Sequence, residues 1–295
     1  MKNKFITVIV LGSLVLGMAG CSSSTKSKGT ITIGSKDFTE NEIVSEVYAL
    51  ALENEGYKVN RKMDIASSVI HTSIVNKQID LYPEYTGTGL ITVLKQKPVN
   101  DPQKVYDIVK KQYNSKYKIT WLDYAKANDG QGIFVSKRVS DKYNIKTLSD
   151  LQKNASKIRF ASQGEFDQRS DGIPALNKKY GKFNFKSSKV YDNGLKYQVV
   201  DQNKADAAPA YTTEGQLSQT NKFVLLTDDK QVWPPYNIAP IVRNSVLKKN
   251  PDIKETLNKI SKHLDTKTVT KLNAKVDISK QDYEDVAEDF YDSIK

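Results

Sequence analysis

Strand-like and helix-like segments alternate along this chain, and their order constrains the fold more than any other feature. Residues 30–34 alternate polar and apolar side chains, and the next segment carries apolar residues at helical spacing up to Gly56. Thr39 and Glu42 predict a capping box at the start of that helix. The pattern continues with a strand over 57–63, a helix over 67–77, a helix over 101–113 and a strand over 118–122. This order is typical of an α/β protein with a parallel sheet.

The same alternation resumes after a flexible polar segment at residues 128–132. The expected elements are strands over 133–135, 158–160, 224–226 and 238–242, helices over 147–154 and 171–180, and a helical region over 248–295. Two α/β units, with the chain crossing near 130 and again near 236, account for this order most simply. We therefore expect lobe 1 to comprise residues 30–129 plus 237–295 and lobe 2 residues 130–236. Two crossing strands would form a hinge with a ligand cleft between the lobes.

The first residues are typical of an exported lipoprotein. Lys2 and Lys4 precede an apolar run over 5–19 that ends in small residues before Cys21. Such a run is shorter than the roughly 20 residues that cross a bilayer, so it predicts a cleaved signal over residues 1–20. The sequence Met-Ala-Gly-Cys resembles a bacterial lipobox, which predicts acylation of Cys21 and a flexible tether over 21–29. The alternative is an ordinary secretion signal with an incidental Cys. Either way, we expect the protein outside the cytoplasm, and with the lipid it would be held at the membrane.

Composition excludes several classes of function. One Cys and two His rule out a disulfide framework and a Cys/His zinc cage. The formal net charge of +11 comes from Lys spread along the whole chain, so nucleic acid is not an expected partner. Neither a GxSxG, HExxH, Walker A nor GxGxxG sequence occurs, and we expect neither an enzyme nor a bound cofactor.

Four segments carry residues suited to binding a small ligand. Lys36 follows a strand and precedes a helix, where it could form a seat for an anion. Residues 80–89 combine two Tyr, a Pro and two Gly, which predicts a rigid loop whose rings could attract a cation. Tyr211 and Tyr236 each lie in a Pro-marked loop, and Arg169 could bind a carboxylate with two hydrogen bonds. The structural alternatives are a solvated Lys, packed Tyr rings, and a local ion pair of Arg169 with Asp167 or Asp171.

Several motifs stand in the order found in a known family. They are Ser35-Lys36-Asp37-Phe38-Thr39-Glu40, Tyr82-Pro83-Glu84-Tyr85-Thr86-Gly87-Thr88, Asp171-Gly172-Ile173-Pro174-Ala175-Leu176, Gly194-Leu195-Lys196-Tyr197 and Pro234-Pro235-Tyr236-Asn237. Together they resemble the substrate-binding proteins of glycine betaine/carnitine/choline ABC importers. The resemblance implies a type II periplasmic-binding-protein fold and delivery of a quaternary ammonium ligand to a transmembrane permease. It also implies a cation cage of Tyr85, Tyr211 and Tyr236 and a carboxylate clamp of Lys36, Thr88 and Arg169.

One position departs from that family. Many members have a fourth cage Tyr where Gln131 stands here, and Asp129 nearby could place a negative charge facing the cation. An amide offers hydrogen bonds but no aromatic face, so we expect a betaine with a polar tail, such as carnitine or ergothioneine, in preference to glycine betaine.

Two alternatives remain. One is a receptor for another small amino-acid-like solute on the same fold, and the other is a wall-associated adhesion or enzyme domain.

Overall fold

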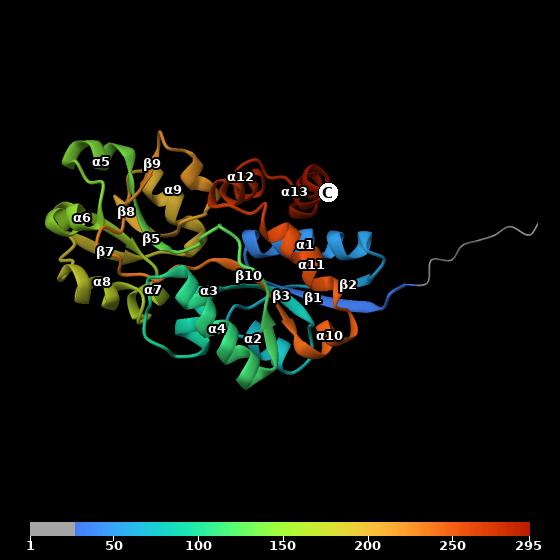
Figure 1. The fold of residues 1–295 in the computed structure, drawn as a ribbon. Coiled ribbons are helices and arrows are strands. Elements are labelled where there is room, and N and C mark those ends of the chain that lie inside the picture. The colour runs from blue at the N-terminus through green and yellow to red at the C-terminus, as the bar shows by residue number, and fades with distance from the viewer. Residues whose placement is uncertain (1–26) are drawn as a thin grey trace, which may run out of the picture.

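The computed structural model describes residues 27–295 (Figure 1). The expected signal segment, Cys21 and most of the expected tether lie outside the described residues. Within residues 27–295, no helix has both the length and the apolar character that crossing a bilayer requires. Two five-stranded sheets organise this part of the chain, each covered by helices on both faces.

The first sheet has the strand order β2-β1-β3-β10-β4. Its strands are β1 (Thr30–Lys36), β2 (Lys58–Ile65), β3 (Leu81–Tyr85), β4 (Ile119–Trp121) and β10 (Ile238–Arg243). The strands β2, β1 and β3 run parallel, and β10 is inserted antiparallel between β3 and β4. The parallel start that the sequence predicts is therefore confirmed, and one late strand completes the sheet.

Helices cover both faces of this sheet. They are α1 (Thr39–Asn54), α2 (Ile70–Val75), α3 (Thr86–Thr88), α4 (Pro102–Tyr117), α10 (Asn244–Lys249), α11 (Asp252–Ser261), α12 (Thr266–Asp277) and α13 (Tyr283–Ile294), with a π-helical turn at Gly89–Val93. In Figure 1, α1 and α11 lie on one face and α2 and α4 on the other. Each face has its own apolar core, the first around α1 and the second around α2 and α4.

The second sheet repeats the same plan in the order β7-β6-β8-β5-β9. Its strands are β5 (Gln131–Ser136), β6 (Arg159–Ser162), β7 (Ser187–Val190), β8 (Ala207–Tyr211) and β9 (Phe223–Leu225). Its helices are α5 (Lys137–Tyr143), α6 (Leu148–Asn154), α7 (Gly164–Gln168), α8 (Ile173–Tyr180) and α9 (Lys196–Asp201), with short 3-10 turns at Ala155–Lys157, Asn193–Leu195 and Gly215–Ser218. Here β7, β6 and β8 are parallel and β5 is antiparallel to β8 and β9. The expected two-lobed α/β fold is confirmed.

Two segments that are distant in sequence run side by side between the sheets. Asn128 and Asn237 form an isolated antiparallel bridge, and the Asn128 side-chain oxygen accepts a 2.6 Å hydrogen bond from the backbone N–H of Tyr236. The expected lobe boundaries, after residues 129 and 236, fall in these two segments. A second contact joins α12 to the turn at Gly215, where a Cβ would come within 2.6 Å of the Ala274 backbone nitrogen. Only glycine permits this close approach.

Three local predictions are wrong. No side chain caps α1, because Phe38 is its N-cap and the Thr39 hydroxyl instead donates a 2.7 Å hydrogen bond to Asp277. Residues 81–85, expected within a rigid loop, form the buried strand β3. The region over 248–295 is not continuously helical but contains the end of α10 and all of α11, α12 and α13, separated by turns.

Candidate ligand-binding site

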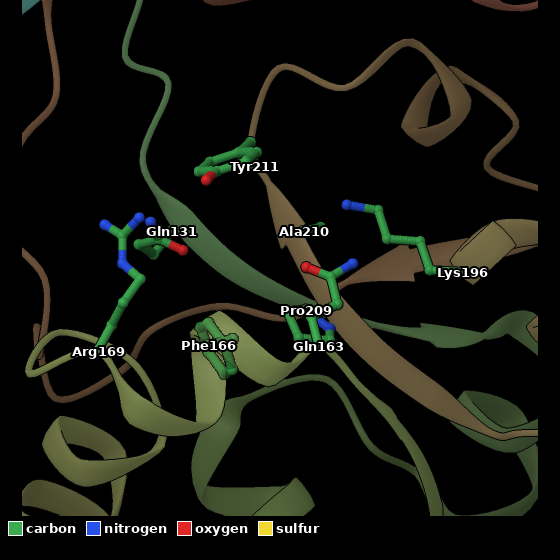
Figure 2. Close-up of a pocket in the computed structure, with 8 residues that line it drawn as sticks. All are labelled: Gln131, Gln163, Phe166, Arg169, Lys196, Pro209, Ala210 and Tyr211. Atoms are coloured by element: carbon green, nitrogen blue, oxygen red, sulfur yellow. The ribbon is translucent and has the colours of Figure 1, made fainter. Parts of the chain in front are cut away.

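A small polar pocket opens at the ends of β5 and β8 in the second lobe (Figure 2). Its lining residues are Gln131, Gln163, Phe166, Arg169, Lys196, Pro209, Ala210 and Tyr211. Gln131, expected in a flexible segment, begins β5, and Tyr211, expected in a loop, is the last residue of β8. The antiparallel register places these two residues directly opposite each other. In Figure 2, the Arg169 guanidinium and the Tyr211 ring both approach Gln131, while Lys196 extends from the other side. Three residues singled out from the sequence are thus brought together here.

Arg169 is held in the pocket wall by a carboxylate. Its Nε and Nη2 atoms each donate a 2.8 Å hydrogen bond to Asp171, one to each carboxylate oxygen. The local ion pair considered from the sequence therefore exists, and Arg169 still lines the pocket. The Tyr236 hydroxyl donates to the same carboxylate at 3.0 Å, and the Trp233 indole donates to the Asp171 backbone carbonyl at 2.6 Å. Burial opposes ionisation of Asp171, but the Arg169 guanidinium outweighs it and lowers the pKa of the carboxyl.

Lys196 is a pocket residue to which the sequence assigned no role. Its side chain is buried and forms an ion pair with Glu214, which also accepts a 2.5 Å hydrogen bond from the Tyr197 hydroxyl. The Lys196 ammonium lies 5.9 Å from the centre of the Tyr211 ring. Lys196 belongs to the Gly194–Tyr197 motif, so this signal was present, but nothing in the local pattern showed that the residue would face a pocket.

The first lobe contributes Tyr85 at the end of β3, next to a second buried ion pair. The Lys36 ammonium lies 2.5 Å from a Glu84 carboxylate oxygen and 4.8 Å from the centre of the Tyr85 ring. The Tyr82 hydroxyl donates to the other Glu84 oxygen at 2.8 Å. Lys36 is the last residue of β1, not part of a turn, and it does not line the pocket described above. Its role in binding a ligand carboxylate stays a prediction.

A buried acidic cluster lies beside Tyr85. The Tyr85 hydroxyl donates a 2.8 Å hydrogen bond to Glu40, the second residue of α1. Asp129 accepts a 2.6 Å hydrogen bond from the Thr213 hydroxyl, and its backbone N–H donates to the Tyr236 carbonyl at 3.0 Å. Burial raises the pKa of Glu40, and burial together with the neighbouring Glu40 raises that of Asp129 well above its ordinary value. Glu40 was missed as a site residue.

The three tyrosines differ in exposure. Tyr211 is 37% exposed, whereas Tyr85 and Tyr236 are buried. The Tyr236 ring packs over Gly87, where a Cβ would meet the ring at 2.6 Å, so any side chain at this position would displace the ring. Thr88 is half-buried at the end of α3, one residue beyond Gly87. The Asp171 carboxylate joins Tyr236 to Arg169, and Glu40 joins Tyr85 to the acidic cluster.

Residues 29–293 match the family described as OpuAC, the substrate binding domain of ABC-type glycine betaine transport system. This chain belongs to that family. The expected recognition is thereby confirmed, over nearly the whole described structure. The family supplies the extracytoplasmic, ligand-binding component of ABC importers, which works with a permease. This chain is a substrate-binding component of an importer of the betaine, carnitine, choline and ergothioneine type.

Individual relatives agree with this assignment. The carnitine transport binding protein OpuCC of Listeria monocytogenes is 32% identical, over 98% of this chain and 96% of that protein. The ergothioneine transport permease/ergothioneine binding protein EgtU of Helicobacter pylori is 30% identical, over 90% of this chain and 47% of that protein. A crystal structure described as a glycine betaine/carnitine/choline ABC transporter superposes with a TM-score of 0.80 at 28% identity, covering 89% of this chain and 98% of the other.

Proposed function

We propose that this protein binds one trimethylammonium compound between its lobes, with the onium group beside Tyr85 and Asp129 and the anionic end towards Arg169. The observation that carries this proposal is an uneven distribution of charge. Glu40 and Asp129 lie beside Tyr85 and have no Lys or Arg within ion-pair distance among the described residues. Arg169 and Lys196 line the pocket around Tyr211. A zwitterion placed in this direction meets the two unbalanced acids at its onium end and, at its anionic end, an Arg169 guanidinium that is already bound to Asp171.

Aromatic rings suit the onium group for a physical reason. A quaternary nitrogen has no N–H to donate, so the faces of Tyr85, Tyr211 and Tyr236 can replace its water by cation–π attraction of about 0.5–2 kcal/mol per ring. The ligand carboxylate does require donors, which Arg169 would supply in this proposal, whereas Lys36 lies beside Tyr85 at the opposite end and is bound to Glu84. A guanidinium can offer two parallel N–H groups to one carboxylate. Tyr85 and Tyr211 belong to different sheets, so a ligand touching both favours the closed arrangement of the lobes.

Gln131 supports a ligand with a polar tail. It lies opposite Tyr211 in the strand register and is buried in the pocket wall, where its amide offers two donors and an acceptor. Gln163 lines the same pocket. Carnitine, with its hydroxyl, and ergothioneine, with its ring, can use such groups in addition to their carboxylates, whereas glycine betaine has no polar group besides its carboxylate. We therefore place these two compounds ahead of glycine betaine and choline.

The proposal includes how the protein is held and how it moves. Acylation of Cys21 would hold it on the outer face of the bacterial membrane through the tether over 21–29, and the ligand would pass to the permease. Residues 30–129 plus 237–295 and residues 130–236 would move as the two lobes. The paired segments around Asn128 and Asn237 would then form the hinge. The work is selective binding and closure, and the proposal assigns no reaction to the protein.

Titration calorimetry of the purified protein with carnitine, ergothioneine, glycine betaine and choline tests the function. We expect carnitine or ergothioneine to bind most tightly. Tightest binding of glycine betaine would contradict the role given to Gln131 but not the cage. No binding of any of the four would leave the alternative of another small amino-acid-like solute.

Tyr211 provides the sharpest test of the cage, because it is the most exposed of the three rings and its loss should least affect folding. Tyr211→Ala should weaken binding at least about tenfold, as the loss of a desolvated cation–π contact implies. Tyr143→Ala is the matched control: its ring also has Lys ammonium groups over it, at 5.1 and 5.2 Å, and it lies outside the pocket. Equal affinity of both variants would show that the cage role of Tyr211 is wrong.

A further inference from the structure

The buried cluster around Glu40 and Asp129 connects elements of both sheets. Glu40 comes from α1 of the first lobe, and its two carboxylate oxygens accept from the Tyr85 hydroxyl at 2.8 Å and from the Asn273 amide at 3.3 Å. The same Asn273 amide donates to the Thr213 carbonyl at 2.8 Å. Thr213 follows β8 of the second lobe and donates its hydroxyl to Asp129. Glu40 is only 3% exposed and Asp129 only 7%.

This cluster has more acceptors than donors. The Thr213 hydroxyl lies against both carboxyl groups but carries a single hydrogen, which its 2.6 Å bond to Asp129 uses. The Asn273 side-chain oxygen is buried and has no hydrogen-bond partner, although the amide nitrogen of the same group has two. A buried acceptor without a donor costs about 1–3 kcal/mol. A proton on either acid adds a donor to the cluster and removes one buried charge.

The charged groups around the cluster are already paired. Lys36, on β1, faces Glu40, but its ammonium is bound to Glu84 on β3. Glu214, in the loop after β8, faces Asp129 and is bound to Lys196 on α9. Each of these pairs is neutral as a whole. Glu40 and Asp129 therefore remain as two buried acids whose charge no described Lys or Arg balances.

Each tyrosine of the proposed cage lies next to this cluster. The Tyr85 hydroxyl binds Glu40, the Tyr236 backbone carbonyl accepts from the Asp129 N–H, and Tyr211 lies two residues before Thr213. A cation held against the Tyr85 ring therefore comes close to the acids and can take the place of the proton as their counter-charge.

We propose that Glu40 and Asp129 hold a proton in the unliganded protein and that the onium group of the ligand displaces it. The O–H bond of the acid breaks, the proton passes to solvent, and the carboxylate then balances the bound cation. Ligand binding and proton release are thereby coupled. This inference rests on the proposed function, because it requires a permanently charged cation in the cage.

Calorimetry in buffers of different ionisation enthalpy counts the protons released on binding. With carnitine and choline as probes, we use pairs of buffers that hold the same pH, acetate and MES near the acid end and phosphate and Tris near the alkaline end. Between about pH 5 and pH 8 we expect release approaching one proton per ligand at the acid end and declining towards the alkaline end. Affinity should rise with pH by at most about tenfold per unit over the same interval. The uncharged carbon analogue of choline, 3,3-dimethylbutan-1-ol, should release no proton.

Two variants and one control locate the proton. Glu40→Gln and Asp129→Asn each remove one acid at nearly constant volume and should at least halve the release. Asp277→Asn is the matched control, because Asp277 is another half-buried acid whose pKa burial raises, on the same helix as Asn273 but bound to Thr39. It should leave the release unchanged. Circular dichroism melts check that each variant is folded.

The outcomes separate this inference from the function on which it rests. Binding of carnitine or choline without proton release at any pH overturns the coupling and leaves the proposed function intact. Unchanged release in both Glu40→Gln and Asp129→Asn also overturns it, since the proton then comes from elsewhere. Failure of all quaternary ammonium probes to bind overturns the proposed function first, and this inference with it.

Discussion

Two buried carboxylates bind the hydroxyls of two proposed cage tyrosines, and their surroundings are opposite. Asp171 accepts from Tyr236 and from the Nε and Nη2 atoms of Arg169, so its charge is balanced. Glu40 accepts from Tyr85 and from an amide, and its acidic neighbour Asp129 adds to the charge that must be balanced. Each of these tyrosines is thus fixed through its hydroxyl, Tyr236 beside a cation and Tyr85 beside an excess of acid. The difference gives the site a direction.

That direction is what a zwitterion requires. Burying a charge without a partner is costly, so the onium group belongs at the end with unbalanced acids and the carboxylate at the end that carries Arg169. A cation without a carboxylate, such as choline, would use only one end. The predictions that follow test this polarity, beginning with the largest expected effect.

The largest effect concerns Lys36, whose charge is matched by Glu84 within the first lobe. Lys36→Met leaves Glu84 buried without its partner and should lower the free energy of unfolding by about 3–5 kcal/mol in urea denaturation. The double variant Lys36→Met/Glu84→Gln should recover much of that loss. If the recovered double variant binds carnitine as tightly as the wild type, Lys36 is structural and the carboxylate end consists of second-lobe groups. Weaker binding despite restored stability would show that Lys36 binds the ligand.

Arg169→Lys tests the cation-rich end directly. A lysine keeps the charge but loses the two parallel donors, and a charged hydrogen bond contributes about 1.5–3 kcal/mol. We expect the affinity for carnitine to fall at least about tenfold, while choline, which lacks a carboxylate, loses little. Competition calorimetry of both ligands on the same variant provides the comparison. Equal losses for the two ligands would mean that Arg169 acts only by positioning Tyr236 through Asp171, and the proposed polarity would be wrong.

The opposite pKa shifts predict opposite effects of pH on stability. The pKa values of Glu40 and Asp129 are raised in the folded protein. Their contribution to the free energy of unfolding is therefore complete below the pKa values of the unfolded chain and is lost as pH rises through the pKa values of the folded protein. The pKa of Asp171 is lowered in the folded protein. Its contribution to the free energy of unfolding is therefore present above the pKa of the unfolded chain and is lost as pH falls through the pKa of the folded protein.

Urea unfolding of the unliganded protein checks this prediction. One proton changes the free energy of unfolding by at most about 1.4 kcal/mol per pH unit. Between about pH 5 and pH 8, the free energy of unfolding should decline as the acids of the cluster ionise, and Glu40→Gln should remove part of this decline. Asp277→Asn should leave the contribution of the cluster to this decline unchanged. A decline that is identical in wild type and Glu40→Gln would show that the acids are not the titrating groups.

The sequence predicted the sheets better than the site, for physical reasons. Alternating or continuous apolar runs mark most strands, and Gly56, with a φ of 90°, ends α1 where expected. The strand β3 lies where the Pro and Gly residues over 80–89 predict a loop, yet in the fold Pro83 lies opposite Pro240 in β10. Here the tertiary pairing overrides the local preference.

The same limit applies to the site. Tyr85, Tyr211, Tyr236 and Arg169 were found through motifs, and the structure ties them together through Asp171 and the acidic cluster. The sequence alone assigns Glu40 no role, and a local pattern cannot show that α12 and the loop after β8 bury it. Its signal was indirect: it closes the motif that begins at Ser35.

The smallest expected effect concerns Gln131, which stands where many family members have a fourth cage tyrosine. Gln131→Tyr places an aromatic face opposite Tyr211 and should strengthen glycine betaine binding by about 1 kcal/mol, or roughly fivefold, since a ring near an onium contributes in that range. The same change removes the amide, so carnitine or ergothioneine should gain less or lose affinity. Gln163→Tyr, at another position lining the pocket, is the control for added bulk. A parallel gain for every ligand would show that Gln131 does not discriminate among them. The acids at the opposite end cannot make the distinction either, because the bound trimethylammonium group is the same in all of these compounds.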